Sequence, residues 1–245
     1  MEEAPSSEDN TEQRSNNLTV STSSIVDAAV RKEYAVTAEY SLLVNDPLDG
    51  MYIVPTYSNP LEWTGLMFVR RGIYQGGIFR FIVKLPDDFP DTQHLPRIIF
   101  NIPVFHPSVD PATNEMDLHK YFPSGWKAGT HHVYHTLVVM QRAFSRIDML
   151  NKVHTEAHEL YEKDKKAFRQ KAEASVKKSR ELAYDIPETA DPHVIRFSPW
   201  DPAVHDGIKQ RIYNSDKPSG PTNCPDTPGT SWVDVEHFVL MAGQQ

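Results

Sequence analysis

The chain has 245 residues, is 39% hydrophobic and carries a formal net charge of -8 at pH 7. The apolar content is sufficient for a folded core, while the acidic balance argues against an electrostatic grip on nucleic acid or an anionic membrane. No apolar run approaches the roughly 20 residues that span a bilayer, and the first residues lack the pattern of a secretory signal. The single cysteine, Cys224, excludes an internal disulfide. We therefore expect a cytoplasmic or nuclear protein without a transmembrane segment.

The N-terminal part of the chain changes character near residue 25. Residues 1–24 are rich in Ser, Asn, Thr and Glu. They cannot bury enough apolar surface to offset the entropy of ordering, so they predict a disordered tail. From Ile25 to about Val44, apolar residues recur at helical spacing, which predicts an amphipathic helix that ends before Asp46-Pro47.

Four successive segments rich in Val, Ile, Phe and Tyr predict β-strands joined by short turns, an arrangement typical of an antiparallel meander. The segments are Met51–Pro55, Trp63–Arg70, Gly77–Leu85 and Arg97–Ile102. The strand positions of Trp63, Phe79 and Phe100 are expected to face the core.

Helical spacing returns after Trp126, in a segment that ends near Asp148 and then in a longer helix predicted over about Thr155–Leu182. The residues expected to point inward are Val133, Leu137, Met140 and Phe144 in the first helix and Leu160, Tyr161, Phe168 and Val176 in the second. The remainder of the chain contains many prolines, with one short helix predicted around Val204–Tyr213.

Two patterns are open to a ligand-binding interpretation. A glycine-rich turn such as Gly76-Gly77 can cradle phosphate, but no Lys-Ser or Lys-Thr pair follows it and it leads into a strand, so a hairpin with positive φ is expected. His131 and His135 have the i and i+4 spacing that can bind zinc. With His132 they form a cluster that lacks an evident third ligand, so a polar cluster at a helix start is expected and no metal or cofactor is predicted.

A run of Lys and Arg makes the helix predicted after residue 155 basic. The run comprises Lys163, Lys165, Lys166, Arg169, Lys171, Lys177, Lys178 and Arg180. Because Glu and Asp are interleaved with it, a solvated helix face is the expected explanation. A docking surface for an acidic partner is the alternative.

Several spaced motifs follow one another between the first strand segments and the later helices. Tyr74-Gln75-Gly76-Gly77-Ile78-Phe79 is followed by Leu85-Pro86-Asp87-Asp88-Phe89-Pro90, then by Pro96 with Phe100, by His106-Pro107 and by Trp126. In this order they resemble the motifs of the ubiquitin-conjugating enzyme family, over about residues 25–170. The resemblance implies an α+β fold with an N-terminal helix, a four-stranded antiparallel meander and C-terminal helices.

A closer resemblance lies partly outside that region. Phe197-Ser198-Pro199-Trp200-Asp201-Pro202 and Val204-His205-Asp206, with Ile102–Pro107 and Leu160–Asp164, are similar to the fused toes (AKT-interacting protein) subfamily, whose insect members are called crossbronx. We expect Trp200 to be a core-capping aromatic in a turn. The alternative is a partner-binding role for Trp200, His205 and Asp206.

The resemblance also locates a site that lacks the family's chemistry. Ubiquitin conjugation needs a cysteine thiolate to carry the acyl group and a donor to the oxyanion, which the family supplies as an Asn after His-Pro. Here Ser108 follows His106-Pro107, and alignment with a two-residue insertion near Pro111-Ala112 places Asp117 at the cysteine position. A carboxylate would form only an unstable mixed anhydride, and Cys224 lies more than a hundred residues downstream.

The predicted function is therefore non-catalytic. We expect a disordered tail (1–24), a ubiquitin-conjugating-enzyme-like domain (25–182), a subfamily-specific extension (183–213) and a flexible tail (214–245). The fused toes resemblance implies a scaffold or adaptor that binds Hook-type coiled-coil adaptors and FHIP-type proteins in vesicle transport, with a contact to the kinase AKT. One alternative is a ubiquitin-conjugating enzyme variant that assists an active enzyme in polyubiquitination. Another is an active enzyme with displaced chemistry.

Overall fold

The structure is a computed structural model that describes residues 9–148, 152–185 and 191–215. Its contacts divide the chain into two units, Met1–Arg196 and Phe197–Gln245, and each is described by itself. Within the described part of the chain, no helix has both the length and the apolar character needed to cross a membrane.

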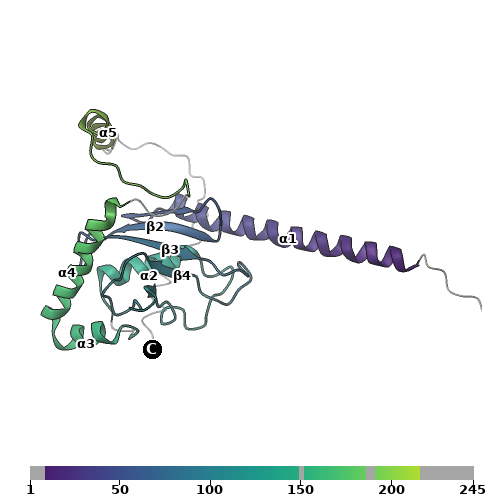
Figure 1. The fold of residues 1–245 in the computed structure, drawn as a ribbon, viewed down its shortest axis with the longest axis horizontal. Helices are drawn as coiled ribbons and strands as arrows, with labels where there is room; N and C mark the ends of the chain where they lie inside the picture. Colours follow the sequence, from purple (N-terminus) through teal and green to yellow (C-terminus); the bar gives the residue numbers. More distant parts are fainter. Residues whose placement is uncertain (1–8, 149–151, 186–190, 216–245) are drawn as a thin grey trace, which may run out of the picture. The chain divides into compact units, whose positions relative to one another are not determined.

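The first unit is built on an antiparallel sheet with the strand order β1-β2-β3-β4-β5 (Figure 1). The strands are β1 Met51–Pro55, β2 Glu62–Phe68, β3 Ile78–Lys84, β4 Arg97–Phe100 and β5 Glu115–Met116. The predicted meander of four strands and the α+β class are confirmed. The sequence did not predict β5, because two residues are too few to show an alternating pattern.

One face of the sheet forms the core with helix α2, Val133–Ser145. Side chains alternate along β3, and Phe79 and Phe81 are almost fully buried. The rings of Phe79 and Phe100 lie 5.2 and 5.3 Å from that of Phe144 on α2. Trp63 is also buried, so the core positions expected on three strands are confirmed.

The turn before β3 uses its two glycines differently. Gly76 has φ +81, a conformation that side chains with a Cβ rarely adopt. Gly77 does not have positive φ, but a Cβ there would lie 2.4 Å from the Phe79 ring. The expected positive φ is therefore present at Gly76 alone, and Gly77 is required for close packing.

Helix α1 begins earlier than predicted. It spans Asp9–Asn45, whereas the spacing predicted a start at Ile25. Neither proline nor glycine interrupts this stretch, so nothing in its backbone chemistry stops the helix between these points. The predicted boundary after residue 24 does not coincide with the start of the helix, and residues 1–8 lie outside the described residues.

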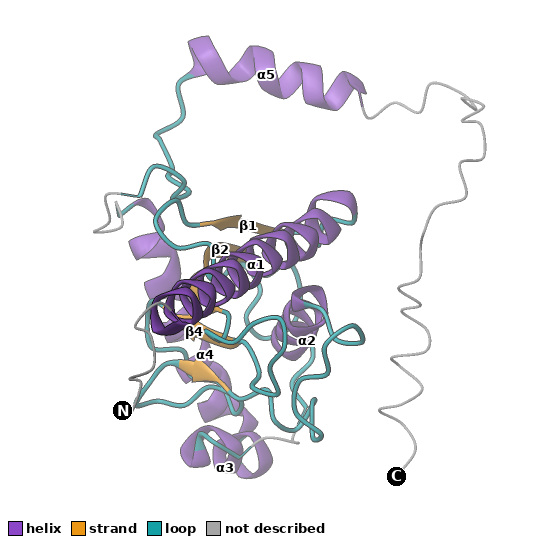
Figure 2. Ribbon diagram, turned by 90° about the vertical axis from the view of Figure 1, so that its right-hand side faces the viewer, coloured by secondary structure: helices purple, strands orange, loops and turns teal. Residues whose placement is uncertain are grey.

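The single long helix predicted after residue 155 is two helices. Helix α3 spans Thr155–Lys163 and α4 spans Lys165–Glu181, followed by a short 3-10 helix, η1, over Leu182–Tyr184. Asp164 separates them: its backbone N–H ends α3, and its carboxylate accepts hydrogen bonds from Lys166 N and Ala167 N at 3.0 Å. Figure 1 shows α4 running from the end of the sheet to α3, and Figure 2 shows α3 from another side.

The segment after η1 returns to the sheet within the first unit. Arg80 on β3 donates from Nη2 to the Ala183 carbonyl (2.9 Å) and from Nη1 to the Ile195 carbonyl (2.7 Å). The Asp191 carboxylate accepts from Tyr57 N–H at 2.8 Å. Residues 191–196 are thus held to the sheet by long-range hydrogen bonds. In the second unit, helix α5 spans Pro202–Ser215, which confirms the short helix predicted there.

Candidate functional site

The residues that follow β4 and the residues that follow β5 form one small substructure. Val109 pairs with Met116 in an antiparallel bridge, and Asp117 N–H donates to the Ser108 carbonyl at 2.8 Å. The structure therefore brings Ser108 and Asp117 next to each other, although eight residues lie between them in the sequence. Pro111 and Ala112, where the insertion is predicted, are exposed in the turn between the two short segments.

His106 ties this substructure to α2. It is fully buried, its Nδ1 accepts from Ser108 N–H (3.0 Å) and its Nε2 lies 3.2 Å from the Ala143 carbonyl. These partners fit a neutral imidazole with its proton on Nε2. The ring stacks on Phe144 at 4.9 Å, and burial lowers the pKa of His106 to about 4. His106 is therefore an uncharged structural residue at neutral pH.

The Ser108 side chain faces the interior. It is fully buried, and its hydroxyl makes no hydrogen bond of ordinary geometry with the described residues. Nearby, the Tyr121 hydroxyl donates to Asp148 Oδ2 at 2.6 Å. Burial and then the Asp148 carboxylate raise the pKa of Tyr121 well above its ordinary value, while the nearby Ser108 hydroxyl lowers this pKa by a smaller amount. A hydroxyl in this position is not presented to a substrate from outside.

The Asp117 side chain lies near the surface and is 18% exposed. Its Oδ1 accepts from His119 N–H and lies 2.9 Å from His119 Nδ1. The His119 side chain is itself 85% exposed. The carboxylate is thus held in a local turn, in contact with a solvated imidazole. Cys224 lies outside the described residues.

His132 and His135 form the capping box of α2, and His131 accepts a hydrogen bond in the turn before the helix. His132 N–H donates to His135 Nδ1 at 3.0 Å, and Lys127 N–H donates to His131 Nδ1 at the same distance. Glu39 of α1 accepts from Val133 N–H (2.8 Å) and contacts His132 Nδ1 (3.0 Å). Among the described residues, no group of three or more His, Cys, Asp or Glu side chains could hold a metal ion. The cluster joins α1 to the N-terminus of α2.

The predicted partner-binding residues lie together in the second unit. Trp200 and His205 rings are 5.0 Å apart, and His205 Nδ1 accepts from Asp201 N–H at 2.8 Å. Lys209 Nζ lies 5.8 Å from the centre of the Trp200 ring. Trp200 is 58% exposed, so within the described residues of its own unit it does not cap a core. Asp206 follows His205 on helix α5 and is exposed.

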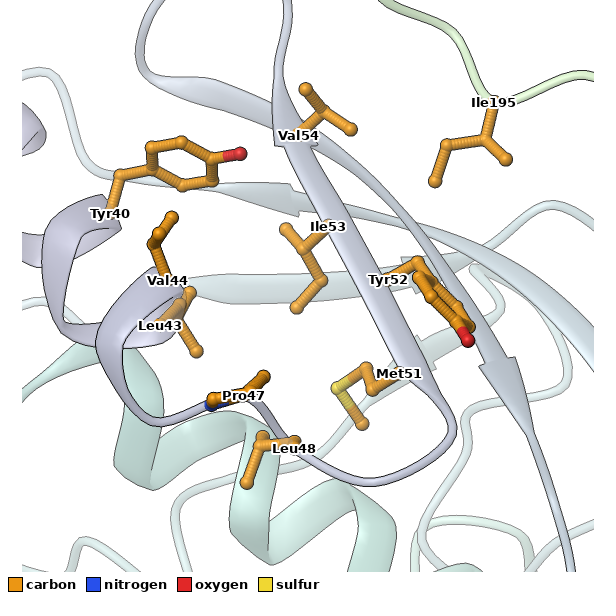
Figure 3. A pocket seen from close by; sticks show the side chains of 10 residues that line it. All are labelled: Tyr40, Leu43, Val44, Pro47, Leu48, Met51, Tyr52, Ile53, Val54 and Ile195. Carbon is orange, nitrogen blue, oxygen red and sulfur yellow. The ribbon is translucent and has the colours of Figure 1, made fainter. Parts of the chain in front are cut away.

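A hollow between α1 and β1 was not predicted. It has a volume of about 330 Å³ and is lined mainly by apolar side chains. Figure 3 shows that these come from α1, β1 and the loop between them, with Ile195 from the returning segment. Val44 and Tyr52 are more than half exposed at its border. The signal in the sequence is the apolar run on both sides of Asp46-Pro47, which we interpreted only as a helix end.

The chain is similar to known proteins over most of its length. A solved structure titled "Novel Ubiquitin-Conjugating Enzyme" matches with a TM-score of 0.49 and 20% identity, covering 58% of this chain and 92% of that chain. The family described as "Ubiquitin-conjugating enzyme" matches residues 35–176. AKT-interacting protein homolog B of Xenopus laevis is 40% identical over 201 residues, and the AKT-interacting protein of Homo sapiens is 40% identical over 202 residues. Each alignment covers 82% of this chain and 68% of the relative. By sequence this chain belongs to the ubiquitin-conjugating enzyme family, within its branch of AKT-interacting proteins.

Proposed function

We propose that the chain is a catalytically inactive member of its family that acts as a scaffold or adaptor. The observation that carries the proposal is the pair Ser108 and Asp117: a buried hydroxyl and a carboxylate adjoin where the family resemblance places the oxyanion donor and the thiolate. A thioester carrier requires a sulfur nucleophile, and an oxyanion donor must be aimed at the reacting carbonyl. Neither requirement is met by these two side chains.

The adaptor role finds support in the second unit. Trp200, Val204 and Ile208 are 58%, 55% and 41% exposed on or next to α5. Exposed aromatic and aliphatic side chains on one helix are the kind of anchors that interfaces use, and Trp is a favoured hot-spot residue. His205 and Asp206 lie beside these anchors and would contribute polar contacts at the rim of the interface.

The partners proposed for this surface follow from the fused toes resemblance. They are Hook-type coiled-coil adaptors and FHIP-type proteins, in a complex that links vesicles to microtubule motors in the cytoplasm. The relatives are named for interacting with AKT, so a contact with that kinase is part of the proposal. The rival function is a ubiquitin-conjugating enzyme variant that assists an active enzyme.

A thioester assay tests the lack of catalysis. With activating enzyme, ATP and ubiquitin, the protein is expected to form no adduct that a reductant removes. Asp117→Cys is expected to give at most a weak adduct with slow discharge onto lysine, because loss of an oxyanion donor costs on the order of 10² to 10³ in rate. Asp117→Cys combined with Ser108→Asn is the matched comparison. A reductant-sensitive adduct on the unchanged protein, lost in Cys224→Ala, would show displaced chemistry instead.

Affinity purification tests the adaptor role. Trp200→Ala is expected to abolish recovery of Hook-type partners without changing the melting temperature. Tyr34→Ala, which removes an aromatic side chain that is 77% exposed on α1, is the matched control and should leave recovery intact. Recovery of an active conjugating enzyme together with ubiquitin, in place of Hook-type proteins, would favour the rival function.

A further inference from the structure

Helix α4 concentrates positive charge in an acidic protein. Its 17 residues contain seven Lys or Arg and only two Glu, whereas the whole chain has a formal net charge of -8. One face of the helix is committed to the protein interior, with Phe168, Ala172, Ser175, Val176 and Ser179 buried. The charged side chains therefore project from the remaining surface of the helix.

Five of these charged residues form a narrow line, which we call the α4 charge stripe. It consists of Lys166, Arg169, Glu173, Lys177 and Arg180, and all five are exposed. Their spacing of three, four, four and three residues keeps them on one side of a helix with 3.6 residues per turn. The order of charges along the stripe is two positive, one negative and two positive.

Internal ion pairs leave most of the stripe uncompensated. Lys171, which is off the stripe, pairs with Glu156 of α3. On the stripe, Lys177 contacts Glu181 at 3.8 Å, with side chains that are 80% and 62% exposed. Pairs this exposed contribute little and are readily exchanged. Lys166, Arg169 and Arg180 have no ion pair with any described residue.

We infer that the α4 charge stripe is a docking surface for an acidic α-helix of a partner protein. A partner helix with carboxylates at the same three- and four-residue spacing would place one carboxylate opposite each cation, as charged residues do across paired helices. The negative residue in the middle selects a partner with a basic residue at the matching position. Such complementarity determines register and speeds encounter more than it adds affinity.

The composition of the stripe favours a protein over a membrane or a nucleic acid. Glu173 lies at its centre, where it would repel a phosphate-bearing surface. Helix α4 carries none of the large exposed apolar side chains found among the described residues, whereas helices that lie on membranes bury such side chains at the lipid boundary.

This inference goes beyond the adaptor proposal, because it names a second surface and stands on the charges of α4 alone. Binding to α4 can fail while the α5 surface still recruits Hook-type partners, and the reverse also holds. The two outcomes are therefore distinguishable in separate experiments.

The probe is a synthetic Ala-based helical peptide with Glu at four positions spaced to match the cations and Lys at the position opposite Glu173. Binding is measured by fluorescence anisotropy with the full chain at about 50 mM and about 200 mM NaCl, between which the screening length falls about twofold. We expect binding that weakens as salt rises. A peptide of the same composition with scrambled charges should bind at least about fivefold more weakly.

Charge reversals on one helix turn provide the matched pair. Arg180→Glu, on the stripe, is expected to weaken peptide binding about tenfold, since an attraction becomes a repulsion. Lys178→Glu, in the same last turn but off the stripe, should change it less than about twofold. Equal losses for the two variants, equal binding of the scrambled peptide, or binding only to phosphatidylserine vesicles or duplex RNA would overturn the inference. Unchanged melting temperatures confirm that both variants fold.

Discussion

Strand β3 and helix α5 place similar side chains in opposite environments. Phe79, Phe81 and Val83 of β3 are at most 1% exposed, whereas Val204 and Ile208 of α5 are 55% and 41% exposed. The apolar side chains of β3 have a second layer, helix α2, against which to pack, and burying each contributes about 1.5–3 kcal/mol to folding. Those of α5 keep their apolar surface available for association. The same residue types thus stabilise the fold in one region and, in our proposal, bind a partner in the other.

The largest loss of stability is expected when a buried aromatic side chain of the sheet is removed. Phe100→Ala removes a ring that contacts Phe79 and Phe144, so it is expected to lower the free energy of unfolding by about 3–5 kcal/mol. Urea unfolding of the variant and the parent measures the difference. Equal stability would mean that the core does not depend on this aromatic cluster.

Acid should weaken the same core through His106. Its pKa in the folded state is about 4, below the ordinary value of 6.5, so the unfolded chain takes up a proton first as the pH falls. The contribution of neutral His106 to the free energy of unfolding is fully present above pH 6.5. It is lost progressively down to about pH 4, by up to about 3 kcal/mol. His135, whose pKa burial also lowers to about 4, acts in the same direction.

Unfolding free energies measured near pH 7 and near pH 4 test this dependence. His106→Gln should be less stable at neutral pH and should lose less stability on acidification. His119→Gln changes an exposed imidazole and is the matched control. An unaltered pH dependence in His106→Gln would contradict the assignment of a buried neutral imidazole.

A smaller effect is expected where the segment after η1 is held to the sheet. Arg80→Met removes the donors to the Ala183 and Ile195 carbonyls, at a cost of about 2 kcal/mol for hydrogen bonds from a charged group. Limited proteolysis should then cut more readily between residues 183 and 196. Arg97→Met, which breaks an exposed pair with Glu115, should leave this susceptibility as it is.

A still smaller loss of stability is expected when the cap between α3 and α4 is removed. Asp164→Ala removes the side-chain cap of α4 and is expected to cost about 1 kcal/mol, while Asp164→Asn should retain most of the stability. Thermal unfolding of the two variants gives the comparison. A cost shared equally by Asn and Ala would mean that the cap hydrogen bonds contribute little.

The smallest effect should be found on α5. Ile208→Ser replaces an exposed apolar side chain and is expected to change the free energy of unfolding by less than about 0.5 kcal/mol. A cost near that of Phe100→Ala would remove the contrast between the buried strand and the exposed helix.

The sequence alone predicted most secondary structure, because alternation and helical spacing are local properties of the chain. All four longer strands begin and end within two residues of the predicted bounds, whereas α2 ends at Ser145, three residues before the predicted Asp148. Local signals were also missed: Asp164 is a typical N-cap residue, and it could have predicted the break between α3 and α4. The start of α1 at Asp9 was not predicted, because apolar residues at helical spacing begin only near Ile25.

Tertiary structure decided what the candidate residues do. The order of the motifs predicted that His106, Ser108 and Asp117 belong to one site. Only the fold shows that α2 buries His106 in a neutral form and that Ser108 faces inward. The same applies to Trp200, which was assigned from the sequence to a core-capping turn and which is exposed within its own unit. Burial and pKa depend on which distant segments meet at a residue, and local spacing carries no information on those contacts.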